Sequence, residues 1–259
     1  MNELNLLIEQ QGHILLITFN RIEKHNAFDD VLLADLQIAL DAAQNDAEIR
    51  VIVLKSNGRH FSAGADVNWM KRMAQFSEQE NREDAQVLAR LMFTLNQCSK
   101  PTIAMVQGSA FGGGAGLVAA CDIAIAGQSA RFCFSEVTLG LIPAVISPYV
   151  IKAIGERAAR WLFMSAEVFD AQRAYELQLI QHCVTDEELL SYTINYAQSI
   201  AQLPPNAVCD AKSLVHQVAG CPIDEALQTK TAALIAKKRV SVEGQRALQA
   251  FLNKEIIPW

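Results

Sequence analysis

Four glycines in the middle of the chain, Gly112, Gly113, Gly114 and Gly116, stand where backbone amides could do chemistry. They follow PTIAMVQG, which is typical of a strand, and lead into GLVAACD, which is typical of a helix. The first amides of a helix have no partner within it, and the helix dipole favours negative charge there. The spacing matches neither G-x-G-x-x-G nor the P-loop pattern, so it predicts no dinucleotide or triphosphate site. A tight turn that needs positive φ explains a lone glycine run equally well.

A second run of small residues, Ser62, Ala63, Gly64 and Ala65, lies in GRHFSAGADVNWM and also follows an apolar segment. Two such strand-to-helix turns in one α/β domain can direct two amides at one point. Paired amide donors form an oxyanion hole, which stabilises charge developing on a carbonyl oxygen.

A carboxylate, Glu136 in FSEVTLG, completes the residues that could do chemistry. Burial disfavours the charged form of a carboxylate, which suits a general acid or base. Taken alone, the pattern fits an ordinary surface glutamate at a strand end better.

The elements that must position these groups alternate between strands and helices. Apolar runs predict strands at residues 13–20, 51–54, 101–108, 121–127 and 130–136. Helical spacing follows Asp29 or Asp30 as a cap, and Ser77-x-x-Glu80 forms a capping box. After about residue 145 the strand signal fades and five helical segments follow. The order favours a parallel sheet covered on both faces, with a boundary at Pro204-Pro205 between a core of residues 1–203 and a helical region of residues 204–259.

Composition excludes several classes of function. Half of the 259 residues are apolar, which is typical of a globular protein. The net charge of −6 does not indicate the basic surface that nucleic-acid binding needs. The histidines show no H-x-x-x-H spacing, the six cysteines form no CxxC pair, and no G-x-S-x-G elbow occurs, so no metal site or serine nucleophile is predicted. The N-terminus resembles neither a signal nor a transit peptide, and no apolar run could span a membrane, so we expect a cytoplasmic protein with reduced thiols.

Three segments, FSAGADV, GSAFGGGAGLVAACDIAIA and FSEVTLGLIP, together resemble the signature regions of the crotonase, or enoyl-CoA hydratase/isomerase, superfamily. The resemblance runs over essentially the whole chain. It implies an α/β fold, a crotonase-like spiral of ββα turns with a C-terminal helical trimerisation region. It also implies an acyl-CoA substrate, no separate cofactor, and a homotrimer or a dimer of trimers.

The resemblance assigns roles to particular residues. Ala63 and Gly113 would supply the oxyanion-hole amides that hold the thioester oxygen as an enolate forms, and Glu136 would exchange the proton. The residues implied to bind the substrate or its CoA moiety are Lys24, Ala27, Ala65, Asp66, Val67, Phe111, Gly112, Pro143 and Lys254. Lys254 would act from a neighbouring subunit, with Lys237, Lys238 and Arg239 as competitors for that role.

Gly116 departs from the hydratase pattern, which has a second glutamate at this position. Two interpretations remain open. A single glutamate fits isomerases that shift a double bond, whereas FGGGxGL with IPAVISP and FSAGADxxWM is similar to bacterial methylglutaconyl-CoA or carboxygeranoyl-CoA hydratases of leucine and terpene breakdown. We favour the hydratase; an inactive acyl-CoA-binding homologue is a further alternative.

Two features of such a hydratase have only candidate residues. Ser147, Tyr149 or a substrate carboxylate could activate water in place of the missing glutamate. A distal substrate carboxylate would need a cationic partner, for which Lys71, Arg72 and Lys152 are candidates.

Overall fold

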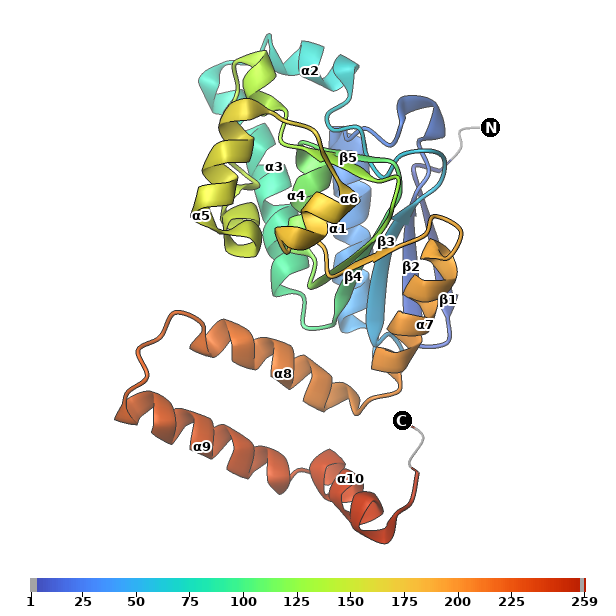
Figure 1. Cartoon of the computed structure of the whole chain (residues 1–259), viewed down its shortest axis with the longest axis vertical. Coiled ribbons are helices and arrows are strands. Elements are labelled where there is room, and N and C mark those ends of the chain that lie inside the picture. Colours follow the sequence, from blue (N-terminus) through green and yellow to red (C-terminus); the bar gives the residue numbers. More distant parts are fainter. Residues whose placement is uncertain (1–3, 257–258) are drawn as a thin grey trace.

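The protein is built on a six-stranded sheet, seen in a computed structural model that describes residues 4–256 and 259 (Figure 1). The strand order is β1-β2-β3-β4-β6-β9, and every neighbouring pair except the antiparallel pair β1–β2 is parallel. The strands are β1 (Leu6–Gln11), β2 (Ile14–Phe19), β3 (Val51–Ser56), β4 (Thr102–Val106), β6 (Ile123–Gly127) and β9 (His182–Val184). The central strands read as apolar runs because both faces of the sheet are covered.

Alternate side chains of these strands enter two separate cores. Leu15, Ile17 and Phe19 of β2 point toward α1 (Asp30–Asn45), α3 (Glu78–Gln97) and α4 (Gly113–Ala120). Ile14 and Leu16 of the same strand point toward α7 (Leu189–Ala201) on the other face. This period of two is what a strand requires.

Local capping fixes where the covering helices begin. The Asp29 side chain accepts a hydrogen bond from the Leu32 amide at the start of α1. Ser77 and Glu80 form the predicted capping box at the start of α3. Both predictions from capping chemistry are confirmed.

A small second sheet carries the segments of the candidate site. It contains β5 (Ser109–Phe111), β7 (Arg131–Cys133) and β8 (Phe169–Asp170), in the order β5-β7-β8. The remaining elements of the body are η1 (Ile22–Lys24), α2 (Val67–Met73), η2 (Glu136–Leu139), α5 (Ser147–Ser165, broken at Gly155) and α6 (Ala171–Glu176). None of the helices in the described residues is long and apolar enough to cross a membrane.

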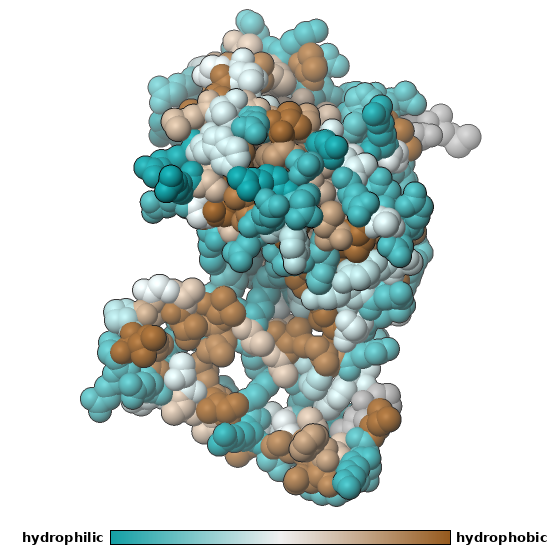
Figure 2. Space-filling view, in the orientation of Figure 1, coloured by the Kyte–Doolittle hydropathy of each residue, from teal (hydrophilic) through white to brown (hydrophobic). Residues whose placement is uncertain are grey.

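Three C-terminal helices form an arm below the body (Figure 1). They are α8 (Pro205–Val218), α9 (Glu225–Arg239) and α10 (Val242–Asn253). No side chain of α8 or α9 is buried, and apolar side chains gather on the arm in Figure 2. Glu243 of α10 accepts hydrogen bonds from the amides of Asn206 and Ala207, which connects α10 to α8.

The structure differs from the sequence-based expectations in several places, and β5 and α10 are among the elements that were not expected. Strand β1 was not predicted, because it is an edge strand whose side chains beyond Leu6 are exposed. Strands β8 and β9 lie after residue 145, where no strand was expected, and they have two and three residues. Glu136 stands in the 3-10 helix η2 rather than at a strand end.

Candidate active site

The two glycine-containing turns lie side by side, as their sequences predicted. Ser62 pairs with Ala110 in a parallel bridge, and the Phe111 amide donates to the Ser62 carbonyl at 3.0 Å. A Cβ on Gly64 would lie 3.5 Å from the Phe111 carbonyl oxygen. The chain therefore brings residues 62–65 against the start of α4.

The start of α4 supplies an unpaired amide. Gly112 has φ +51° and ψ −121°, a conformation that favours glycine, and its own amide donates to the Cys133 carbonyl. The Gly116 amide is the first to bond within the helix, to the Gly112 carbonyl at 3.1 Å. The Gly113 amide has no hydrogen-bond partner among the described residues, which agrees with its predicted role as a donor.

The second donor differs from the prediction. The Ala63 amide donates to the His25 carbonyl at 3.0 Å, so it is not free for a substrate oxygen. The Ala65 amide has no partner within residues 4–256 and 259, and Ala65 is exposed. Phe28 lies beside both free donors: it bridges to Ala65, and a Cβ on Gly113 would lie 3.3 Å from its ring. The pair of amides that the fold leaves available is that of Ala65 and Gly113.

Glu136 lies directly against the start of α4. A Cβ on Gly112 would lie 3.4 Å from Glu136 Oε1, at van der Waals contact, so the carboxylate adjoins the backbone that leads into α4. Glu136 Oε2 is buried and has no hydrogen-bond partner within the described part of the chain. Burial raises the pKa of Glu136, because the charged form loses solvation, and a hydrogen bond from its own backbone amide offsets this only in part. Such a carboxyl group exchanges protons closer to neutral pH than an ordinary glutamate does.

A buried arginine holds the Ala65 turn in place. Arg21 donates to the Ala27 carbonyl at 2.7 Å and pairs with Asp29 at 2.6 Å and Asp66 at 3.2 Å. Burial alone would raise the pKa of Asp66, but hydrogen bonds from Lys24 and from the first amides of α2 outweigh it and lower that pKa. The contacts of Arg21 thus connect three segments around Ala65: the loop before α1, the start of α1 and the start of α2.

The backbone on either side of Ala65 is equally fixed. The Phe28 amide donates to the Gly64 carbonyl, and the Asp66 amide donates to the Phe28 carbonyl, both at 2.7 Å. This leaves the Ala65 amide between two anchored neighbours.

The residues expected to bind CoA divide into two groups. Lys24, Ala27, Asp66 and Val67 gather around the Ala65 turn, with Lys24 paired to Asp66 at 2.8 Å. Phe111 and Gly112 lead into α4, and Pro143 is buried before α5. Lys254 ends α10, in the arm at the opposite end of the long axis from α2 (Figure 1). Within one chain it does not reach the site, and its role stays a prediction.

An isoleucine fills the space at Gly116, where a second carboxylate was missing from the sequence pattern. A Cβ on Gly116 would overlap Ile146 Cγ2 and would lie 3.2 Å from Met92 Cε. The chain therefore brings one carboxylate, Glu136, to this face of α4, together with apolar side chains.

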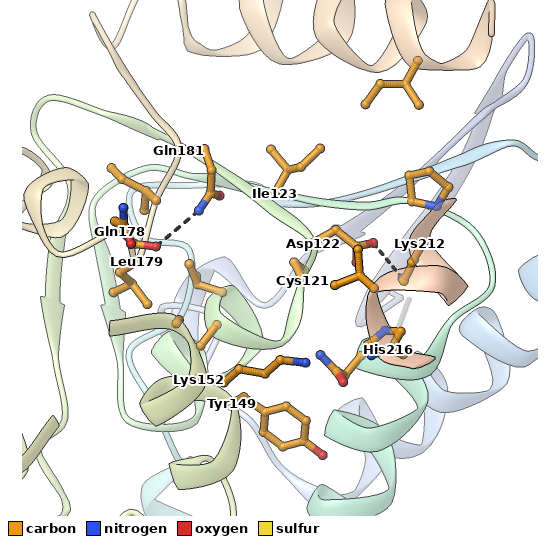
Figure 3. Close-up of a pocket in the computed structure, with 18 of the residues that line it drawn as sticks. Cys121, Asp122, Ile123, Tyr149, Lys152, Gln178, Leu179, Gln181, Lys212 and His216 are labelled. Atoms are coloured by element: carbon orange, nitrogen blue, oxygen red, sulfur yellow. Dashed lines mark hydrogen bonds and ion pairs between the residues drawn. The ribbon is translucent and has the colours of Figure 1, made fainter. Parts of the chain in front are cut away.

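Two residues considered for water activation or charge pairing line another cavity. Tyr149 and Lys152 face a cavity of about 1120 Å³ between the body and α8 (Figure 3). Its lining includes the C-terminal half of α4 but neither Glu136, Ala65 nor Gly113. On its far side Lys212 pairs with Asp122 at 2.7 Å. The structure therefore does not bring Tyr149 or Lys152 to the candidate site.

The remaining candidates for water activation or charge pairing differ in whether their side chains already have partners. The Ser147 hydroxyl donates to the Ala144 carbonyl, and Arg72 pairs with Asp30 at 2.5 Å. Lys71, in the last turn of α2, is exposed and forms no ion pair with any described residue. Within residues 4–256 and 259, no three His, Cys, Asp or Glu side chains gather as a metal site would require.

Comparisons with known proteins identify the family. The enoyl-CoA hydratase/isomerase family profile matches residues 9–259. The chain belongs to the enoyl-CoA hydratase/isomerase family. The mixed α/β crotonase fold and an enzyme of the hydratase/isomerase class are thereby confirmed.

Individual relatives agree with this membership. A crystal structure of a putative enoyl-CoA hydratase/isomerase from Legionella pneumophila is 65% identical, with a TM-score of 0.95 and 97% of each chain covered. An enoyl-CoA hydratase structure from Shewanella pealeana is 42% identical, with a TM-score of 0.94, covering 98% of this chain and 96% of the other. The 2,3-dehydroadipyl-CoA hydratase of Escherichia coli is 33% identical over 252 residues, 96% of each chain.

Two residues of this family member's site, and the role of a third, were missed from the sequence. Arg21 is buried against partners that include Asp66, which is distant in the sequence. The segment NRIEKHNAF around Arg21 does not indicate that its charge is buried. Ile146 lies in an apolar run that gave no sign of contact with Gly116. The donor role of Ala65 was missed because Ala63 and Ala65 look alike until their backbone partners are known.

Proposed function

We propose that this enzyme adds water to the α,β double bond of an enoyl-CoA thioester. One observation carries the proposal: the half-buried Glu136, whose Oε2 is fully buried, lies beside the free amide end of α4, and the free amide of Ala65 belongs to the adjoining turn. A carboxyl group with a raised pKa next to paired amide donors suits proton exchange at the carbon beside a thioester.

The proposed reaction needs no group besides these. Glu136 takes a proton from water while the water oxygen bonds to C3. The π electrons of the C2–C3 bond form a new double bond between C2 and the carbonyl carbon, the carbonyl π electrons move to the thioester oxygen, and the Ala65 and Gly113 amides stabilise the resulting enolate. The protonated carboxyl of Glu136 then gives its proton to C2, which yields the 3-hydroxyacyl thioester and restores the carboxylate.

We further propose that the acyl chain carries a distal carboxylate, as in 3-methylglutaconyl-CoA, an intermediate of leucine breakdown. Lys71 supports this proposal, because it is a cation in α2, the helix that follows Ala65 and Asp66, and forms no ion pair with a described residue. The name of the E. coli relative, 2,3-dehydroadipyl-CoA hydratase, also describes a dicarboxylic acyl group.

A second reaction on the same site is double-bond isomerisation. The observation that favours it is the side chain of Ile146 at Gly116, because one carboxylate suffices to move one proton between two carbons. The trimer or dimer of trimers and the cytoplasmic location remain predictions.

Labelled water separates the two reactions. The purified protein is incubated with 3-methylglutaconyl-CoA and with crotonyl-CoA in ¹⁸O-water, and the product mass is followed. We expect label in the hydroxyacyl product, more rapidly from the carboxylated substrate, and none with Glu136→Gln. Conversion of a non-conjugated 3-enoyl-CoA without label would establish the isomerase instead. Equal rates with both conjugated substrates would remove the distal-carboxylate proposal.

A further inference from the structure

Gly116 is glycine for reasons of space rather than of backbone conformation. It lies inside α4 and its φ is not among the positive values of the chain, so other residues could adopt its conformation. The obstacle is Ile146, whose Cβ would lie 2.8 Å from a Cβ on Gly116. Real Cβ atoms do not approach so closely in a packed interior.

Ile146 is itself firmly held. It is 2% exposed and belongs to the main core, and its carbonyl accepts hydrogen bonds from the amides of Tyr149 and Val150 at the start of α5. A β-branched side chain has few rotamers to escape into. Any side chain at position 116 therefore requires a smaller residue at position 146.

The contact lies next to the proton-exchanging group. Gly112, the N-cap residue, and Gly116 are four residues apart, about 6 Å along the axis, and the Gly116 amide donates to the Gly112 carbonyl at 3.1 Å, so the two positions adjoin on one face at the start of α4. Glu136 lies against this face at Gly112, and Ile146 lies against it at Gly116. The side chain that follows Glu136 along the helix is thus an apolar one.

We propose that Ile146 is a specificity-determining residue, which keeps this face of the site apolar and makes Glu136 the sole acid–base group at the reacting carbons. This inference rests on the proposed hydratase function. It gives a reason for Gly116 in the chain's own packing, and it requires Glu136 to serve both the water and the C2 proton.

A stability cycle tests the packing without any substrate. Gly116→Ala should lower the midpoint of urea unfolding, and Ile146→Ala in the same chain should recover most of that loss. Ile103→Ala, at a buried isoleucine in the other core, is the matched control and should recover nothing. If Ile146→Ala fails to relieve Gly116→Ala, the steric pairing is wrong.

The kinetic test adds the second carboxylate. In the wild type we expect the pH profile of kcat to show the ionisation of one carboxyl group. Gly116→Glu combined with Ile146→Ala should add a second ionisation and hydrate crotonyl-CoA at least about tenfold faster than Gly116→Glu alone. Gly116→Glu with Ile103→Ala should show neither change.

Two results would overturn the proposal. One is a single ionisation in a folded Gly116→Glu/Ile146→Ala variant, since this face would then not adjoin the reacting carbons. The other is full activity of Gly116→Glu with Ile146 intact. A wild type that hydrates nothing while the stability cycle behaves as expected would count against the hydratase function and not against the packing.

Discussion

At the residue scale, Glu136 combines catalytic suitability with a cost in stability. Its side chain is half-buried, its Oε2 is fully buried and has no hydrogen-bond partner among the described residues, and burial raises its pKa. A carboxyl group whose pKa is higher in the folded than in the unfolded state favours folding most at low pH. That advantage is lost as pH rises through the folded-state pKa.

Glu136→Gln should therefore abolish turnover and stabilise the fold. Because general acid–base groups contribute about 10²–10⁴-fold, we expect a loss of at least that size in kcat. The melting temperature should rise above that of the wild type at pH 8, where the carboxylate is charged, and the difference should shrink at pH 4. A variant that is less stable than the wild type at pH 8 would contradict the assigned burial cost.

In the proposed hydration, the raised pKa of Glu136 sets the acidic side of the activity profile. Hydration begins with the ionised carboxylate, so the rate should fall as pH drops through this pKa. The midpoint of kcat/KM against pH should lie above the value of about 4.3 typical of a free glutamate. A midpoint at or below that value would place the proton exchange on another group.

The choice between Ala63 and Ala65 can be tested directly. A bound thioester oxygen should shift the amide resonance of Ala65, because this amide has no other partner within residues 4–256 and 259. The amide of Ala63 should move little, since it donates to His25. We would record spectra of ¹⁵N-alanine-labelled protein with butyryl-CoA, which cannot be hydrated. A large shift at Ala63 alone would restore the assignment implied by resemblance.

At the element scale, the turn around Ala65 depends on charges from three segments. Arg21 joins the loop before α1, the start of α1 and the start of α2 through Ala27, Asp29 and Asp66. Removing Arg21 takes away the 2.6 Å ion pair of Asp29 and leaves Asp66 paired with Lys24. The contacts of Arg21 therefore position the Ala65 amide.

Arg21→Met should lower the free energy of unfolding by about 3–5 kcal/mol, as for other broken buried pairs. Because the role proposed for the Ala65 amide is to stabilise the transition state, kcat should fall more than KM rises in the protein that remains folded. Arg82→Met, which breaks an exposed pair with Glu78, should change stability by less than about 1 kcal/mol. Equal losses in the two variants, measured by urea unfolding, would contradict the positioning role of Arg21.

Prediction from sequence succeeded where one segment determines its own structure. Apolar runs identified the buried strands, and short polar side chains identified the starts of α1 and α3. Sequence-based prediction failed where two residues that contact each other are far apart in the sequence. Arg21 and Asp66, for example, are separated by 45 residues. Likewise, the pairing of Gly116 with Ile146 arises only when α5 packs against α4. The general location of the site was therefore predictable, but its donor pair and its apolar face were not.

At the scale of the whole molecule, the C-terminal arm leaves large apolar side chains exposed within a single chain. No side chain of α8 or α9 is buried, and several large apolar side chains of the arm are exposed: Val215, Ile223, Ile235, Val240, Val242, Phe251 and Leu252. An apolar surface of this kind is unfavourable in water and is typical of an association surface. The predicted oligomer would cover it, and it would also give Lys254 a route to the CoA of another subunit.

The arm therefore makes a prediction about assembly. We expect light scattering after size exclusion to give three or six times the 28.5 kDa of one chain. Phe251→Asp, at a side chain 79% exposed on α10, should shift the protein toward the monomer, because a charge cannot be buried unpaired in an apolar interface. Ile8→Asp, at an exposed apolar side chain on edge strand β1, should leave the mass unchanged. If Phe251→Asp stayed fully assembled while Ile8→Asp dissociated, the contacts between subunits would lie on the sheet edge and not on the arm.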